Sequence, residues 1–227
     1  MKKRVFYTEL SYVLGIIILA FGTALMEYAD YGMSMVVAPA YLVYLKLSQT
    51  LPFFTFGMAE YTLQAVILVL MVIILRRFKI TYFFSFVTAV LYGFTLDAAM
   101  AVVGVLTGII AGPKIVFFLV GMFCGSIGVS LFFHTYISPE AYELFVKEVS
   151  AKFKININKF KTGYDCTSCL IGIVLSFAFF GLWHFEGVKL GTVFCALVNG
   201  FLIGRCSAFF EKRWEFKDRF ALKKYFQ

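Results

Sequence analysis

Six long apolar stretches run along the chain, separated by short segments that hold most of its charged residues. We predict membrane-spanning helices over residues 6–28, 57–75, 80 to beyond 97, 115–133, 165–183 and 189–210. A helix that crosses a bilayer needs roughly 20 predominantly apolar residues, and each stretch approaches or exceeds that length. The pattern leaves open whether residues 98–112 continue the third span or form a separate segment. It predicts an all-α, polytopic membrane protein.

A shorter apolar segment follows the first span, at residues 33–55. Pro39 and Pro52 interrupt it, and the part between them is too short to cross a bilayer. Either a re-entrant half-helix or an interfacial helix fits this segment. Re-entrant backbone persists at membrane depth only where it lines a cavity or is buried in protein.

The segment after the fourth span is amphipathic. Between residues 142 and 153, apolar side chains recur at the i, i+3, i+4, i+7 and i+11 positions, with charged residues on the other face. Ser138 is expected as the N-cap and Pro139 as the first helical residue. We predict an amphipathic helix that lies on the membrane surface.

The glycine pattern of the first half recurs in the second. The spacings are 7, 35 and 36 residues in one half and 7, 35 and 37 in the other, for Gly15, Gly22, Gly57 and Gly93, then Gly121, Gly128, Gly163 and Gly200. We therefore predict two three-helix repeats, at residues 1–112 and 113–210, and a basic tail at 211–227. Three spans per repeat require the second repeat to enter from the opposite side, as in many secondary transporters and some channels. We expect one membrane domain with a polar pocket where the repeats meet.

Composition agrees with a membrane location. The 227 residues are 61% hydrophobic and 15% charged, against roughly 45–50% and 25% in soluble domains. The net charge of +8 comes from basic residues near the span ends. This placement predicts cytoplasmic N- and C-termini in the cell membrane, and it does not indicate nucleic-acid binding. The first apolar run is too long for a signal peptide.

Two further patterns suggest partners. The basic residues of the tail, spread among aromatic ones, indicate contact with anionic lipid. Gly104, Gly108 and Gly112 have G-x-x-x-G spacing, which favours tight helix packing within a protomer or in a homo-oligomer.

Several short motifs resemble one family. They are Gly22-Thr-Ala-Leu25, residues 29–34 (Ala-Asp-Tyr-Gly-Met-Ser), Phe56-Gly57, and Gly93 followed by Asp97. In this order they resemble the YczE/YitT-type bacterial integral membrane proteins. The chain departs from that pattern at residues 35–37, where Met-Val-Val replaces Pro-Trp-Asp. The resemblance implies a similar fold, and it implies no assigned activity.

Ionisable groups within a membrane cost about 2.5–3.5 kcal/mol each on insertion scales, so they mark candidate sites. Asp97 and Glu60 are the best candidates, with Gln64 one turn from Glu60, and Glu27 and Asp30 on the same predicted outer side. These acids would attract cations or take up a proton during transport; the alternative is a structural role at the membrane interface.

Two candidates come from the second half. His134 is either a proton relay or an interfacial histidine, and Asn199 either bonds a neighbouring helix or binds a ligand. Cys166 and Cys169 form a C-x-x-C motif that is either core packing or a functional thiol pair. The sequence contains no nucleotide-binding, zinc-protease or hydrolase motif, so we expect no enzyme activity, metal or cofactor.

These patterns predict that the chain moves a small solute across the cytoplasmic membrane, with proton-coupled secondary transport as one mechanism and a channel as another. Two alternatives remain. One is a substrate-binding membrane subunit that borrows a separate ATPase, and the other is a non-transporting membrane regulator or assembly factor.

Overall fold

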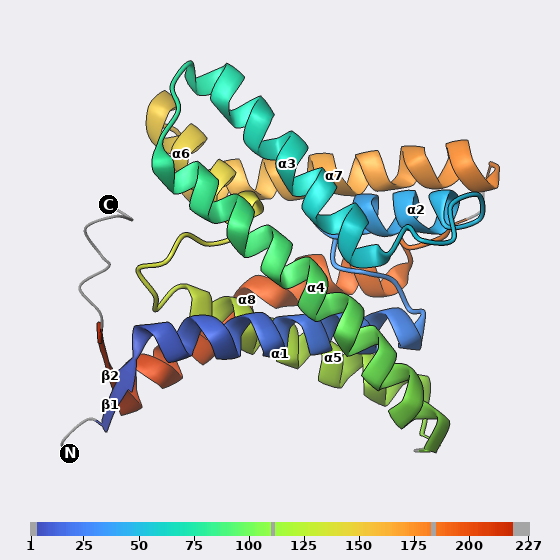
Figure 1. Ribbon diagram of the computed structural model, residues 1–227, viewed down its shortest axis with the longest axis horizontal. Helices are drawn as coiled ribbons and strands as arrows, with labels where there is room; N and C mark the ends of the chain where they lie inside the picture. The colour runs from blue at the N-terminus through green and yellow to red at the C-terminus, as the bar shows by residue number, and fades with distance from the viewer. Residues whose placement is uncertain (1–3, 110–111, 183–184, 220–227) are drawn as a thin grey trace.

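The computed structural model describes residues 4–109, 112–182 and 185–219. The elements follow one another as β1 (Arg4–Tyr7), α1 (Thr8–Ala29), α2 (Ala38–Leu47), α3 (Phe56–Leu75), α4 (Ile80–Ile109), α5 (Lys114–Phe132), α6 (Ala141–Phe153), α7 (Ile157–Phe180), α8 (Leu190–Arg213) and β2 (Trp214–Lys217). Figure 1 shows their arrangement. Among the described residues, six helices are long and apolar enough to span a membrane: α1, α3, α4, α5, α7 and α8. The all-α polytopic membrane fold is confirmed.

The helix bounds settle the open question about the third span. α4 is continuous from Ile80 to Ile109, so residues 98–109 extend that span, and the next two residues lie outside the described part. α7 begins at Ile157, eight residues before the predicted start, because the polar stretch ahead of residue 165 is also helical. α7 ends at Phe180, before Gly181, whose φ of 102° disfavours other residues. Residue 183 of the predicted span is not described.

Two short strands were not predicted. β1 and β2 pair in parallel from Arg4 with Trp214 to Tyr7 with Lys217, so the start of α1 lies beside the end of α8. The Phe6 ring packs against Phe216 at a centroid distance of 5.7 Å. Part of the expected first span and part of the basic tail are therefore in this ribbon. We call this end of the molecule the strand end and the opposite end the far end (Figure 1).

The first helices of the two predicted repeats, α1 and α5, cross with their backbones in close contact. A methyl group added at Gly22 would lie 2.7 Å from the carbonyl oxygen of Gly121, and one added at Gly15 would lie 3.2 Å from that of Gly128. The earlier glycine of α1 meets the later glycine of α5, and the later one meets the earlier one, so the two helices run antiparallel. Because only glycine allows this approach, there is no room for a solute between α1 and α5 at this crossing.

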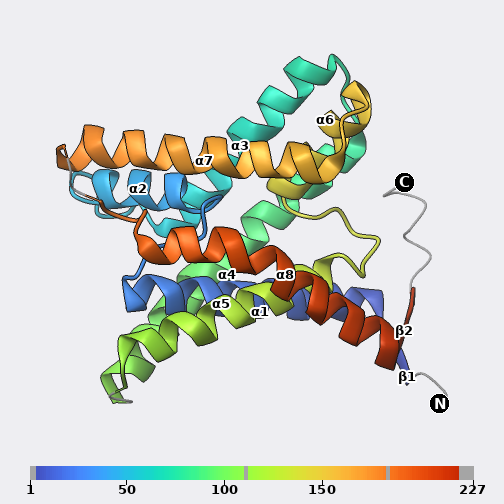
Figure 2. The ribbon, with the colours of Figure 1, turned by 180° about the vertical axis from the view of Figure 1, so that it is seen from behind.

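The two short helices lie along spanning helices. α2 packs on α7, with Ala38 near Gly172 and Lys46 Nζ 3.5 Å from the Phe179 carbonyl oxygen, so it runs toward the far end. α6 packs on α3, with Ala141 beside Gln64 and Lys152 Nζ 2.6 Å from the Ile74 carbonyl oxygen, and it runs toward the strand end. Figure 2 shows α2 beside α7 from behind.

The predicted surface location of α6 is wrong. Its amphipathic pattern is present, but the apolar face contacts protein: Tyr142, Leu144 and Val149 share a buried cluster with Leu68 and Met71 of α3. The helix also begins later than predicted. Its N-cap is Glu140, while the Ser138 and Pro139 carbonyls accept hydrogen bonds from Thr88 and Ser85 of α4.

Candidate functional site

The contact between α6 and the candidate spanning helix α3 buries a cluster of polar side chains. The Tyr142 hydroxyl donates to Glu60 Oε2 at 2.9 Å. The Gln64 amide nitrogen lies 3.4 Å from both Glu60 Oε2 and Glu140 Oε2, and so bridges the two carboxyl groups. The Ala141 backbone N–H donates to Gln64 Oε1 at 3.0 Å. We call Glu60, Gln64, Glu140 and Tyr142 the carboxyl cluster.

The carboxyl cluster is shielded from solvent. Glu60 and Gln64 are 0% exposed and Glu140 is 6% exposed. Within the described part of the chain, Glu60 Oε1 and Glu140 Oε1 are buried without a hydrogen-bond partner. Burial raises the pKa of Glu140 well above its ordinary value, and the neighbouring acids Glu143 and Glu60 add to this, while the bond from Gln64 opposes it. Such a site favours a protonated carboxyl group or a bound cation.

Hydroxyl groups from two other helices, α1 and α4, lie around the cluster. The Tyr12 hydroxyl of α1 lies 2.8 Å from Thr88 Oγ1 of α4, which in turn donates to the Ser138 carbonyl oxygen at 3.0 Å. The buried Tyr92 hydroxyl lies 2.9 Å from Thr23 Oγ1. Hydrogen bonds from Ser85 and Thr88 therefore hold the segment before α6 against α4.

Asp97, predicted as a transport residue, lies against the start of α3. Its Oδ1 accepts the Gly57 backbone N–H at 2.8 Å, and its Oδ2 accepts the Thr55 hydroxyl at 2.6 Å. Thr55 is the N-cap of α3 and accepts the Met58 backbone N–H. The carboxylate thus satisfies free donors at a helix N-terminus, where the helix dipole favours negative charge. The structure does not bring Asp97 into the carboxyl cluster.

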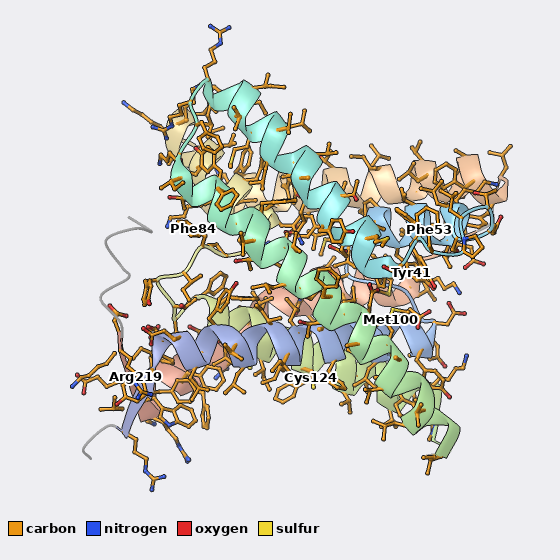
Figure 3. The ribbon with its side chains drawn as sticks, in the orientation of Figure 1. Tyr41, Phe53, Phe84, Met100, Cys124 and Arg219 are labelled. Carbon is orange, nitrogen blue, oxygen red and sulfur yellow. The ribbon has the colours of Figure 1, made fainter. Side chains whose placement is uncertain are left out.

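Glu27 and Asp30 lie close to Tyr41, which is labelled in Figure 3. The Tyr41 hydroxyl donates to Glu27 Oε1 at 3.5 Å, and Lys189 Nζ lies 2.6 Å from Asp30 Oδ1. The recess lined by these two acids, Met33 and Tyr41 holds no space for a water molecule. These acids are separate from Glu60 and do not form one outer cavity with it.

The second-half candidates contact neighbouring helices. The Ser126 hydroxyl of α5 donates to Asn199 Oδ1 at 2.7 Å, as expected for a residue that bonds a neighbouring helix. His134 Nδ1 lies 2.8 Å from the Ser130 carbonyl oxygen, so this nitrogen carries the proton. Its Nε2 lies 3.4 Å from Glu211 Oε1, and its ring stacks on Phe216 of β2. His134 joins α5 to the strand end.

The remaining motifs add no ligand set. Cys166 and Cys169 are free thiols, the first exposed and the second half-buried. Within the described residues, no group of three or more histidine, cysteine or acidic side chains could hold a metal ion. A methyl group added at Gly104 or Gly108 would meet no atom within 4 Å, so this part of the G-x-x-x-G motif packs against nothing in the described protomer.

A family model described as "Family of unknown function (DUF6198)" matches residues 6–208. The chain belongs to this family. No curated protein and no solved structure matches it. The resemblance to the YczE/YitT-type proteins stays a prediction. In this DUF6198 member the carboxyl cluster lies inside the matched region, whereas β2 begins after its end.

Sequence reasoning found half of the cluster in this DUF6198 chain. Glu60 and Gln64 stand out as polar residues one turn apart in an apolar span, and they are confirmed as neighbours. Glu140 and Tyr142 were missed because they belong to a segment predicted to lie on the surface. The available signal was the Ser-Pro-Glu sequence at 138–140, which marks a helix start but not its depth.

Proposed function

We propose that this protein moves a small solute across a membrane, and that two half-helices entering from opposite faces form the translocation path. One observation carries the proposal: α2 and α6 both begin inside the molecule and run outward, α2 to the far end along α7 and α6 to the strand end along α3. Half-helices of this kind, with N-termini at membrane depth, build solute and ion sites in secondary transporters.

The packing supports the predicted inverted repeat. Gly15 contacts Gly128 and Gly22 contacts Gly121, which is the exchange expected when two equivalent helices meet across a local twofold axis. The half-helix of each repeat lies on the second spanning helix of the other, α2 on α7 and α6 on α3. A duplicated unit of opposite orientation gives two equivalent states that face opposite sides. Alternating access is therefore the mechanism that we favour over a fixed channel.

The tight contact between α1 and α5 places the path elsewhere. Val36, just before α2, packs against the buried cluster formed by α3 and α6, so the two half-helix starts approach each other. A solute would bind between these starts, near the carboxyl cluster. Since the carboxyl cluster is shielded from solvent, a solute could reach it only if α2 or α6 moved away from its spanning helix. A half-helix can do this without breaking the α1–α5 contact.

The basic residues at the strand end and at the far end support one orientation of the protein in the membrane. The strand end carries Arg4, the basic run at 76–79 and the basic residues of β2 and its flanks, whereas the far end has Lys46, Lys114 and Lys189. We propose that the strand end faces the cytoplasm, where these residues would contact anionic lipid.

Solute flux in proteoliposomes tests the proposal. Vesicles with the purified full chain, and empty vesicles, would be loaded with an isotope-labelled extract of small metabolites and analysed by mass spectrometry for loss of each compound. We expect selective loss of one chemical class from the protein-containing vesicles only. Glu60→Gln should slow this loss, while the matched exposed variant Gln49→Glu should not. Retention of every compound, with and without a pH gradient, would contradict transport and favour the regulator alternative.

A further inference from the structure

We infer that the carboxyl cluster is a binding site for a single proton, shared between Glu60 and Glu140, and that this proton holds α6 against α3. The inference deepens the proposed function, because it names the coupling ion and the helix that it controls. It goes beyond the sequence expectation, which had no partner for Glu60 in the second half of the chain.

The donors at the site are too few for two negative charges. Glu60 receives the Tyr142 hydroxyl and one Gln64 N–H, and Glu140 receives the other Gln64 N–H at 3.4 Å. One oxygen of each carboxyl group is buried with no hydrogen-bond partner among the residues that the structure describes. Two ionised carboxylates that share one neutral amide would repel each other in a poorly solvated site, so one of them keeps a proton.

The ionisable groups around the cluster do not supply a positive charge that would replace this proton. Its electrostatic neighbours are Tyr12 of α1, Tyr92 of α4, Glu143 of α6 and Tyr164 of α7, none of which is a base. Lys161 of α7 acts on Glu143 beside the cluster, and it also pairs with Asp165 at 3.7 Å. The helix dipole at the start of α6 favours a charge on Glu140, but this effect is smaller than the cost of burying an uncompensated charge.

Loss of the proton would act directly on the α6 contact. The Ala141 backbone N–H donates to Gln64 Oε1, and the same Gln64 bridges the two carboxyl groups. When both carboxyl groups are charged, repulsion separates Glu60 on α3 from Glu140 at the start of α6 and breaks this bridge. The N-terminal turn of α6 then leaves α3, which is the movement that the proposed path requires.

Stability against pH tests the proton site without any solute. Full-length protein in nanodiscs would be melted between about pH 6 and about pH 9, in sodium and in choline buffers. Because the pKa of Glu140 is raised in the folded state, its favourable contribution is complete below the ordinary value of about 4.3 and is lost as pH rises through the raised value. We expect the Tm to fall by about 3–6 °C across this range. Glu140→Gln, which imitates the protonated form, should lack this fall.

Hydrogen exchange of the Ala141–Leu144 amides gives the second readout. In the parent protein their protection should decrease with rising pH by more than the intrinsic exchange rate explains, and in Glu140→Gln it should not. Glu148→Gln is the matched control, since Glu148 lies on the same helix but pairs with Lys79. It should keep the alkaline loss of protection.

Three results would overturn the inference: an alkaline Tm loss that Glu140→Gln retains, uniform protection of α6 at every pH, or alkaline stabilisation by sodium but not choline. The last result would assign a metal cation to the site. Since neither measurement involves flux, absence of transport would leave the proton site standing, and absence of the proton site would leave transport standing.

Discussion

The closest contact between the two predicted repeats provides a direct test of the packing. Gly22→Ala adds one methyl group, which would lie 2.6 Å from the Gly125 nitrogen and 2.7 Å from the Gly121 carbonyl oxygen. Ordinary contacts lie at about 3.5–4.0 Å, so α1 and α5 must separate by roughly 1 Å at their crossing. Overpacking of this size costs about 1–3 kcal/mol.

Gly104→Ala, in the spanning helix α4, is the matched control. Its added methyl group would meet no atom within 4 Å. Both variants gain about 0.5–1 kcal/mol of helix propensity, so that term cancels in the comparison. We expect the Tm of Gly22→Ala to lie about 3–10 °C below that of Gly104→Ala in the same nanodiscs. Equal melting temperatures would refute the claim that α1 and α5 meet at these glycines.

Three further perturbations address the site and its supports. Asp97→Asn removes charge-assisted bonds to Gly57 and Thr55, and should lower stability by about 1–3 kcal/mol in a denaturation titration; an unchanged midpoint would contradict the capping role. Burial alone would raise the pKa of Glu148, but Lys79 and Arg77 outweigh it and lower that pKa. Glu148 therefore contributes at most about 1 kcal/mol above about pH 4, lost as pH falls further, and acid melts should show this loss in the parent but not in Glu148→Gln. Asn199→Leu removes the bond that the Ser126 hydroxyl donates across to α8, but the Met122 carbonyl oxygen, 2.9 Å from the same hydroxyl, stays as its acceptor; the variant should therefore cost only about 0.5–1.5 kcal/mol by the same titration, and adding Ser126→Ala should not increase that cost.

The spanning helices could be predicted from the sequence because burial in lipid demands long apolar runs, and these are local features. The packing of α6 against α3 could not be predicted in this way. Its apolar face, with Tyr142 and Val149, suits a lipid interface and a protein groove equally well, and only α3 decides between them. β1 and β2 were missed because each has four residues and their pairing joins Arg4 to Trp214. No local pattern reports so distant a partner.

The same distinction applies to the candidate site: neighbours within one helix could be predicted, and partners from distant segments could not. Glu60 and Gln64 lie one helical turn apart, so a single span reveals them. Glu140 reaches them only through the fold of α6, 76 residues away from Gln64. Asp97 was one of the two best sequence candidates because apolar residues flank it, but those residues do not indicate its partner Thr55, whose hydroxyl it accepts.

The opposite entry of the two half-helices is tested most directly by labelling from each membrane face. In a background with all five native cysteines replaced, Thr50→Cys follows the outward end of α2 and Ile155→Cys follows that of α6, and both positions are exposed. A membrane-impermeant thiol reagent should label Thr50→Cys from one face and Ile155→Cys only from the other. Labelling of both from the same face would contradict an inverted architecture and the translocation path built on it.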